Sequence, residues 1–223
     1  MVDTDTGPGP GRGVLPAPVR GRLGAVAGLA ALVVLGLGVL YGGDSGPGRL
    51  DARVWGLLGE AGTSWRAVAE AVDFLGEPVG AAALVLGTVM GCLLLRRPRA
   101  AVLVVAGSGV AVLATTVLKS VVGRTIHGGY LAFPSGHTAF LTAYALVTAL
   151  LVTGRLGLGR TAGPSLVLAA GAAAGAVMGW AQIVLGAHYP TDVLGGWFTA
   201  LAVVPATAWL VDRVADTARP GGR

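Results

Sequence analysis

The sequence is poor in charged residues. Asp, Glu, Lys and Arg make up 12% of its 223 residues, whereas ordinary soluble domains carry roughly 25%. Hydrophobic residues make up 54%, and several runs exceed the ~18 apolar residues that suggest a spanning helix. This shortage of charge argues against a soluble domain and predicts an all-α, polytopic membrane helical bundle.

Cysteine and lysine are almost missing. Cys92 is the only cysteine, so no disulfide can form within the chain. The net charge of +5 comes from 15 arginines and one lysine, Lys119, against 11 acids. In a membrane protein such an excess sets topology more readily than it binds nucleic acid, and no nucleic-acid partner is expected. The use of Arg, Ala, Gly and Val over Lys favours a bacterial source.

Six transmembrane helices are expected, at about 23–41, 78–95, 100–119, 136–154, 164–186 and 190–211. Residues 1–22, rich in Gly and Pro, are predicted to be a disordered cytoplasmic tail. Residues 23–212 would form the six-span domain and 213–223 a second cytoplasmic tail. The first run is longer than a signal-peptide core and no small-residue cleavage site follows it, which favours an uncleaved anchor over a signal peptide.

Residues 44–77 separate the first two spans and hold six of the eleven acids. Apolar residues are spread among them, which predicts one or two amphipathic helices at the membrane interface. A loop with chance apolar spacing is the alternative. A second pattern, Gly171, Gly175 and Gly179 at four-residue spacing, predicts close packing of the fifth span against a neighbour.

The arginines predict the orientation. Eleven of the sixteen cations fall on the side of the amino-terminal tail, so both termini should be cytoplasmic. Lys119, His137, His188 and Asp192 then all lie at helix ends on the extracytoplasmic face of the cell membrane. Ionisable groups are expensive near a bilayer and usually mark function there.

Two helix starts on that face carry reactive side chains. Ser135 is a predicted N-cap, and the free N–H groups of Gly136 and His137 would form an anion site. The alternative is that Pro-Ser-Gly only begins a helix and binds nothing. Asp192, one turn into the last span, can reach back to His188 and fix the tautomer of its ring. A capping acid beside an interfacial histidine is the alternative there.

These residues resemble the signature motifs of a known family. Lys119-Ser-Val-Val-Gly-Arg124, Phe133-Pro-Ser-Gly-His137 and Gly186-Ala-His188-Tyr-Pro-Thr-Asp192 are similar, in order and spacing, to the three motifs of the type 2 phosphatidic acid phosphatase superfamily. Its membrane members are six-span lipid phosphate phosphatases. It also contains soluble vanadium-haloperoxidase-like enzymes, which the hydropathy of this chain excludes.

The resemblance implies a role for each residue. His188 would be the nucleophile that forms a phosphohistidine, Asp192 its polarising partner, and His137 the general acid and then base. Lys119, Arg124, Ser135 and Gly136 would hold the phosphoryl oxygens. Cations and a helix start supply the positive potential, so neither a metal nor another cofactor is expected.

The sequence departs from the family pattern at two positions. The first motif has an arginine seven residues after its lysine, where this chain has Ile126, followed by His127. The third motif has an arginine six residues before its histidine, where this chain has Gln182. Arg124 is expected to substitute for one lost arginine, and His127 to add charge when protonated.

The expected function is that of an integral membrane lipid phosphatase acting on a lipid phosphomonoester or a prenyl diphosphate at the outer face. Its partners would be the bilayer and a membrane lipid substrate, and the oligomeric state is left open. A lipid phosphotransferase with the same histidine pair is one alternative. A catalytically weakened lipid-phosphate binding protein, favoured by the missing arginines, is another.

Overall fold

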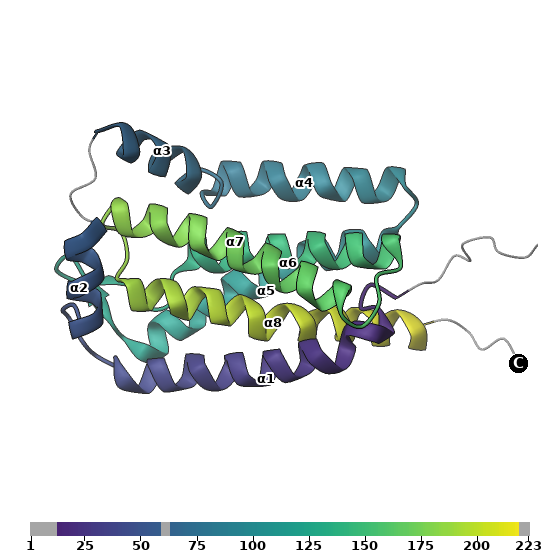
Figure 1. Ribbon diagram of the computed structural model, residues 1–223, viewed down its shortest axis with the longest axis horizontal. Helices are drawn as coiled ribbons and strands as arrows, with labels where there is room; N and C mark the ends of the chain where they lie inside the picture. The colour runs from purple at the N-terminus through teal and green to yellow at the C-terminus, as the bar shows by residue number, and fades with distance from the viewer. Residues whose placement is uncertain (1–12, 59–62, 219–223) are drawn as a thin grey trace, which may run out of the picture.

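The computed structural model describes residues 13–58 and 63–218 and is a bundle of long helices lying side by side (Figure 1). Five of them are long and apolar enough to cross a membrane, and a sixth span arises if the bent pair α3 (Thr63–Asp73) and α4 (Pro78–Leu94) is counted as one. The chain is therefore an all-α, multi-pass membrane protein, as predicted. The long helices are α1 (Ala17–Leu40), α4 (Pro78–Leu94), α5 (Pro98–Val122), α6 (Gly136–Leu156), α7 (Ala162–Val184) and α8 (Pro190–Thr217).

The first and last helices extend into the segments that the sequence assigned to the two tails. Helix α1 begins at Ala17, and the residues just before it are ordered: the N–H groups of Val14 and Leu15 donate to the Asp212 carboxylate at 2.7 and 3.0 Å. Helix α8 continues to Thr217 rather than ending near residue 211. Residues 1–12 and 219–223 of the predicted tails lie outside the described residues.

The segment between the first two spans forms two short helices, α2 (Arg49–Leu58) and α3 (Thr63–Asp73), which confirms the expectation of amphipathic helices there. Helix α2 lies across one end of the bundle (Figure 1). Helix α3 packs on α7, where Ala69 is buried against Ala181 and Val184. Its axis meets that of α4 at 54°. Helices α2 and α3 thus place side chains from outside the motifs at the end of the bundle where His137 and His188 lie.

A small hairpin adds the only strands among the described residues. Strand β1 (Thr125–Ile126) pairs antiparallel with β2 (Tyr130–Leu131), with Thr125 opposite Leu131. The turn between them contains Gly128 and Gly129, whose φ angles of 78° and 139° favour glycine. The hairpin carries the chain from the end of α5 to the start of α6.

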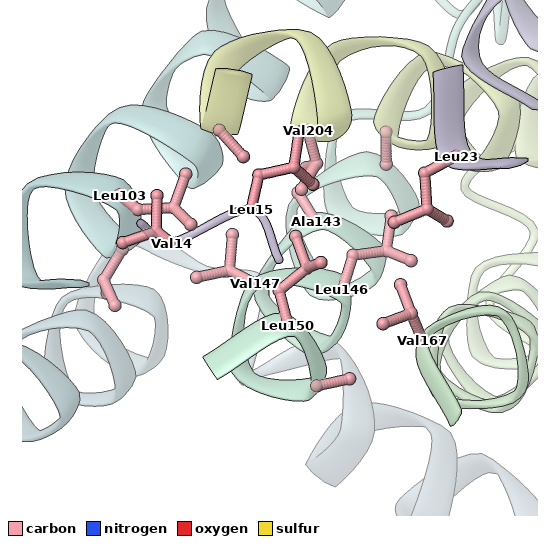
Figure 2. Close-up of a cluster of buried hydrophobic side chains, with 14 of the residues drawn as sticks. Val14, Leu15, Leu23, Leu103, Ala143, Leu146, Val147, Leu150, Val167 and Val204 are labelled. Carbon is pink, nitrogen blue, oxygen red and sulfur yellow. The ribbon is translucent and has the colours of Figure 1, made fainter. Parts of the chain in front are cut away.

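The apolar core lies between α1, α5, α6, α7 and α8, toward the end of the bundle away from the hairpin (Figures 1 and 2). Leu103 and Val147 are fully buried there. The predicted glycine ladder permits close packing on two sides: a Cβ on Gly171 would come within 2.7 Å of Leu146 on α6, and one on Gly175 within 2.6 Å of Trp197 on α8. The ladder is thus a packing feature.

Candidate active site

His137 lies in the first turn of α6, where the sequence places an N-cap. The Ser135 hydroxyl accepts hydrogen bonds from the Thr138 N–H at 3.4 Å and the Thr138 hydroxyl at 3.1 Å, which confirms Ser135 as the N-cap. The His137 side chain is 34% exposed. The positive end of the helix dipole, which favours bound anions, therefore lies beside a partly exposed imidazole.

His188 lies in the turn between α7 and α8, and Pro190 begins α8 as predicted. Asp192, in the first turn of α8, accepts a hydrogen bond from the Tyr189 N–H at 2.9 Å through Oδ2. The same oxygen lies 3.7 Å from His188 Nδ1. Asp192 therefore lies beside Nδ1 of His188 as predicted, but at a separation longer than a hydrogen bond, and Nδ1 has no hydrogen-bond partner among the described residues.

The environment of His188 keeps its imidazole neutral. Burial lowers the pKa of His188, and the neighbouring Lys119 and His137 lower it further, while the Asp192 carboxylate opposes the shift. A neutral imidazole has a lone pair with which to attack. His188 is only 8% exposed, so its reactive form is also shielded from bulk water.

Direct contacts between the two helix starts hold the histidines together. The Ser135 N–H donates to the Asp192 carbonyl at 2.9 Å. Gly196 of α8 lies so close to the Ser135 carbonyl that a Cβ there would collide with it. Lys119, near the end of α5, donates to the Leu131 carbonyl at 2.9 Å. Six of the seven predicted site residues, all except Arg124, thus come from three segments that meet at one end of the bundle.

Arg124 has other partners than the predicted phosphoryl group. Its guanidinium is fully buried and pairs with Asp192 Oδ1 at 2.7 Å and with Asp51 Oδ2 at 2.6 Å. It also lies over the rings of Tyr41 and Tyr189, 4.3 and 4.5 Å from their centroids. These contacts occupy the guanidinium, so the geometry argues against the expected replacement of a lost phosphate-binding arginine.

Asp51, on α2, is a site residue that sequence reasoning missed. It is fully buried, and its two oxygens accept hydrogen bonds from the Thr191 N–H at 2.9 Å and the Thr191 hydroxyl at 3.0 Å. We call Asp51, Arg124, Thr191 and Asp192 the Arg124 cluster. One signal pointed to it: Asp51 shares a helix face with Val54 and Trp55, where an acid is out of place unless it is paired.

The two departures from the family pattern differ in their surroundings. Ile126 is buried with Ala132 and Tyr189 in a small apolar cluster. Gln182 is also buried, and its Nε2 donates to Asp73 Oδ1 of α3 at 2.5 Å. His127 faces the Gly186 carbonyl, with 2.7 Å between Nε2 and the oxygen. Among the described residues, the hydrogen-bond partner of Gln182 from another helix is thus a carboxylate, that of Asp73.

Asp73 is the second site residue that the sequence did not single out. Its Oδ1 lies 3.7 Å from His137 Nε2. Across the described residues, no three His, Cys, Asp or Glu side chains are grouped as metal ligands would be. Asp73 thus lies beside His137, while Lys119 and Asp192 act on His188.

Residues 100–216 match the sequence model of the PAP2 superfamily. The chain belongs to the PAP2 superfamily. The matched residues include both histidines, Asp192 and Lys119, as well as helices α5 to α8 almost whole. A comparison with curated proteins finds no match.

The PAP2 fold extends beyond the matched residues. The structure is similar to the crystal structure of the first transmembrane PAP2 type phosphatidylglycerolphosphate phosphatase from Bacillus subtilis, with a TM-score of 0.67 and 20% identity. The similarity covers 86% of this chain and 97% of the other. Similarity at 20% identity supports the fold alone. At 86% of this chain, it extends to the amino-terminal helices, which the sequence motifs do not include.

Proposed function

We propose that this PAP2 protein is a lipid phosphatase that hydrolyses a lipid phosphomonoester or a prenyl diphosphate through a phosphohistidine. The observation that carries the proposal is the pairing of His188 with Asp192, 3.7 Å from Nδ1 to the carboxylate, beside the start of α6. A neutral, oriented imidazole next to a helix start is suited to phosphoryl transfer, which depends on positioning and charge stabilisation.

In the first step, His188 Nε2 attacks the phosphorus and the bond from phosphorus to the leaving oxygen breaks. The electron pair of that bond goes to the leaving oxygen, and His137 donates a proton to it. In the second step, His137 takes a proton from water while the water oxygen bonds to phosphorus. The nitrogen–phosphorus bond then breaks, its electron pair returns to His188, and phosphate leaves.

The other site residues would stabilise the transferring group. Lys119 and the N–H of Gly136 would face the phosphoryl oxygens, with Ser135 fixing the helix start. Arg124 would act indirectly, because its pair with Asp192 Oδ1 holds the carboxylate that faces His188. The chemistry proposed here needs no metal ion. By the positive-inside bias of the arginines, the site would face outward from a bacterial cell membrane.

The test is phosphate release by purified protein in mixed micelles. The panel contains phosphatidic acid, phosphatidylglycerolphosphate, a prenyl diphosphate and the water-soluble glycerol 3-phosphate. We expect release from a lipid and little from the soluble ester, because each tail CH₂ kept out of water contributes ~0.8 kcal/mol. His188→Ala should reduce release to background, and EDTA should leave it unchanged.

His127→Ala is the matched control, since the one side-chain hydrogen bond of this third histidine among the described residues is with the Gly186 carbonyl. It should keep most of the activity, within roughly tenfold of the parent. Loss of activity on metal removal, or full activity in His188→Ala, would refute the mechanism. Transfer of phosphate to added diacylglycerol in preference to water would make the protein a phosphotransferase instead.

A further inference from the structure

Asp73 places a negative charge next to the reacting histidine. Its carboxylate lies 3.7 Å from His137 Nε2 and accepts a hydrogen bond from Gln182, where the PAP2 motif has an arginine. Apart from His137 itself when protonated, no Lys or Arg side chain among the described residues pairs with Asp73. The side chain is 23% exposed, so the carboxylate is not fully enclosed in the protein.

The imidazole of His137 is held toward Asp73. Gly76, in the turn after α3, packs against the Cγ–Cδ2 edge of the ring, next to Nε2, and a Cβ there would collide with His137 Cδ2. Helix α3 and the turn after it thus contact the ring on the side that carries Nε2. Any group that takes a proton from Nε2 must come close to the same carboxylate.

Resting on the proposed function, we infer that Asp73 is a specificity-determining residue that selects lipid phosphomonoesters over lipid diphosphates. The two substrates differ in what leaves. When His137 protonates the leaving oxygen of a monoester, a neutral lipid alcohol departs. When it protonates the leaving oxygen of a diphosphate, the departing lipid monophosphate still carries negative charge.

Electrostatics makes this difference large enough to measure. A leaving phosphate bound to Nε2 would place its charge within a few ångströms of Asp73. Repulsion between like charges at such separations, at the effective dielectric near a protein surface, corresponds to a rate difference on the order of tenfold to a hundredfold. Arg124 does not offset it, because its guanidinium is already paired with two carboxylates.

The experiment compares kcat/KM for geranylgeranyl phosphate and geranylgeranyl diphosphate in the same mixed micelles. The parent should prefer the monophosphate. Asp73→Asn keeps the shape and removes the charge, so it should raise diphosphate hydrolysis relative to monophosphate hydrolysis by about tenfold or more. Glu77→Gln, four residues on at the exposed start of α4, is the matched control and should leave the ratio unchanged.

Gln182→Arg provides an independent variant, because it would pair Asp73 with a cation without altering Asp73 itself. It should shift the ratio in the same direction. An active parent whose ratio stays the same in both variants would overturn the inference and leave the phosphatase proposal standing. A parent that releases phosphate from neither substrate, nor from the other lipids of the panel, would overturn both.

Discussion

At the scale of the residue, His188 depends on its surroundings for its protonation state. Burial lowers its pKa, and Asp192 partly opposes that shift. A lowered pKa means that the imidazole stays neutral, and therefore nucleophilic, to lower pH than a free histidine, whose pKa is about 6.5.

The acid limb of kcat/KM against pH should therefore lie below about pH 6.5. Asp192→Asn removes the carboxylate that opposes the shift, so the acid limb should move further down while kcat falls by orders of magnitude. The measurement is kcat/KM for phosphatidic acid across the mildly acidic range. A limb that moves upward in Asp192→Asn would mean that Asp192 does not act on His188 as a charge.

The guanidinium of Arg124 has partners that the spacing of the motif did not predict. Its spacing from Lys119 suggested a phosphate contact. Helix α5, however, ends at Gly123 in a left-handed conformation (φ 67°), so the chain turns away from the helix direction before Arg124. Two acids from other elements then bind the guanidinium, and only one of them, Asp192, belongs to the motifs.

At the scale of the element, the Arg124 cluster connects α2 to the start of α8. Removing one partner of a buried pair leaves an unpaired charge and costs about 3–5 kcal/mol. Arg124→Ala should therefore lower the thermal unfolding midpoint strongly in detergent. Arg66→Ala is the control: its pair with Glu70 is more than half exposed, and such pairs contribute about 1 kcal/mol or less. Equal midpoints in the two variants would contradict a structural role for the cluster.

The glycine ladder of α7 gives a second prediction at this scale. A Cβ on Gly179 would collide with Val193 of α8, whose β-branched side chain is stiff. Gly179→Ala should destabilise the protein by about 1–3 kcal/mol through overpacking. Gly109→Ala, on an exposed face of α5 with no neighbour within 4 Å of the new Cβ, should not. Unfolding midpoints of the two variants provide the comparison.

The elements differ in how far sequence alone could predict them. The long helices follow from hydropathy because a span must be long and apolar, and the helix starts follow from Ser135 and Pro190 because capping is local chemistry. The partners Asp51 and Asp73 could not be predicted in the same way. Both sit on short helices whose docking depends on tertiary contacts, so no pattern along the chain pairs them with Arg124 or His137.

At the scale of the whole molecule, the described helix ends divide into two groups. The α4–α5 turn and the end of α8 lie at one end of the bundle, and the hairpin with the site lies at the other (Figure 1). In a Cys92→Ala background, Tyr130→Cys on the exposed hairpin should react with an impermeant thiol reagent in intact cells. Arg160→Cys, exposed in the α6–α7 loop, should react only after the membrane is opened. The reverse pattern would invert the proposed orientation.

The contact between Asp212 and the backbone of Val14 and Leu15 has a consequence for biosynthesis. The two ends of this contact are separated by 197 and 198 residues, so it cannot form until nearly the whole chain has left the ribosome. Among the described helices, α1 is synthesised before α8, on which it mainly packs. It therefore inserts into the membrane before its principal neighbour exists. A chain truncated before α8 would leave the α8-facing surface of α1 exposed to the lipid and to the quality-control proteases of the membrane.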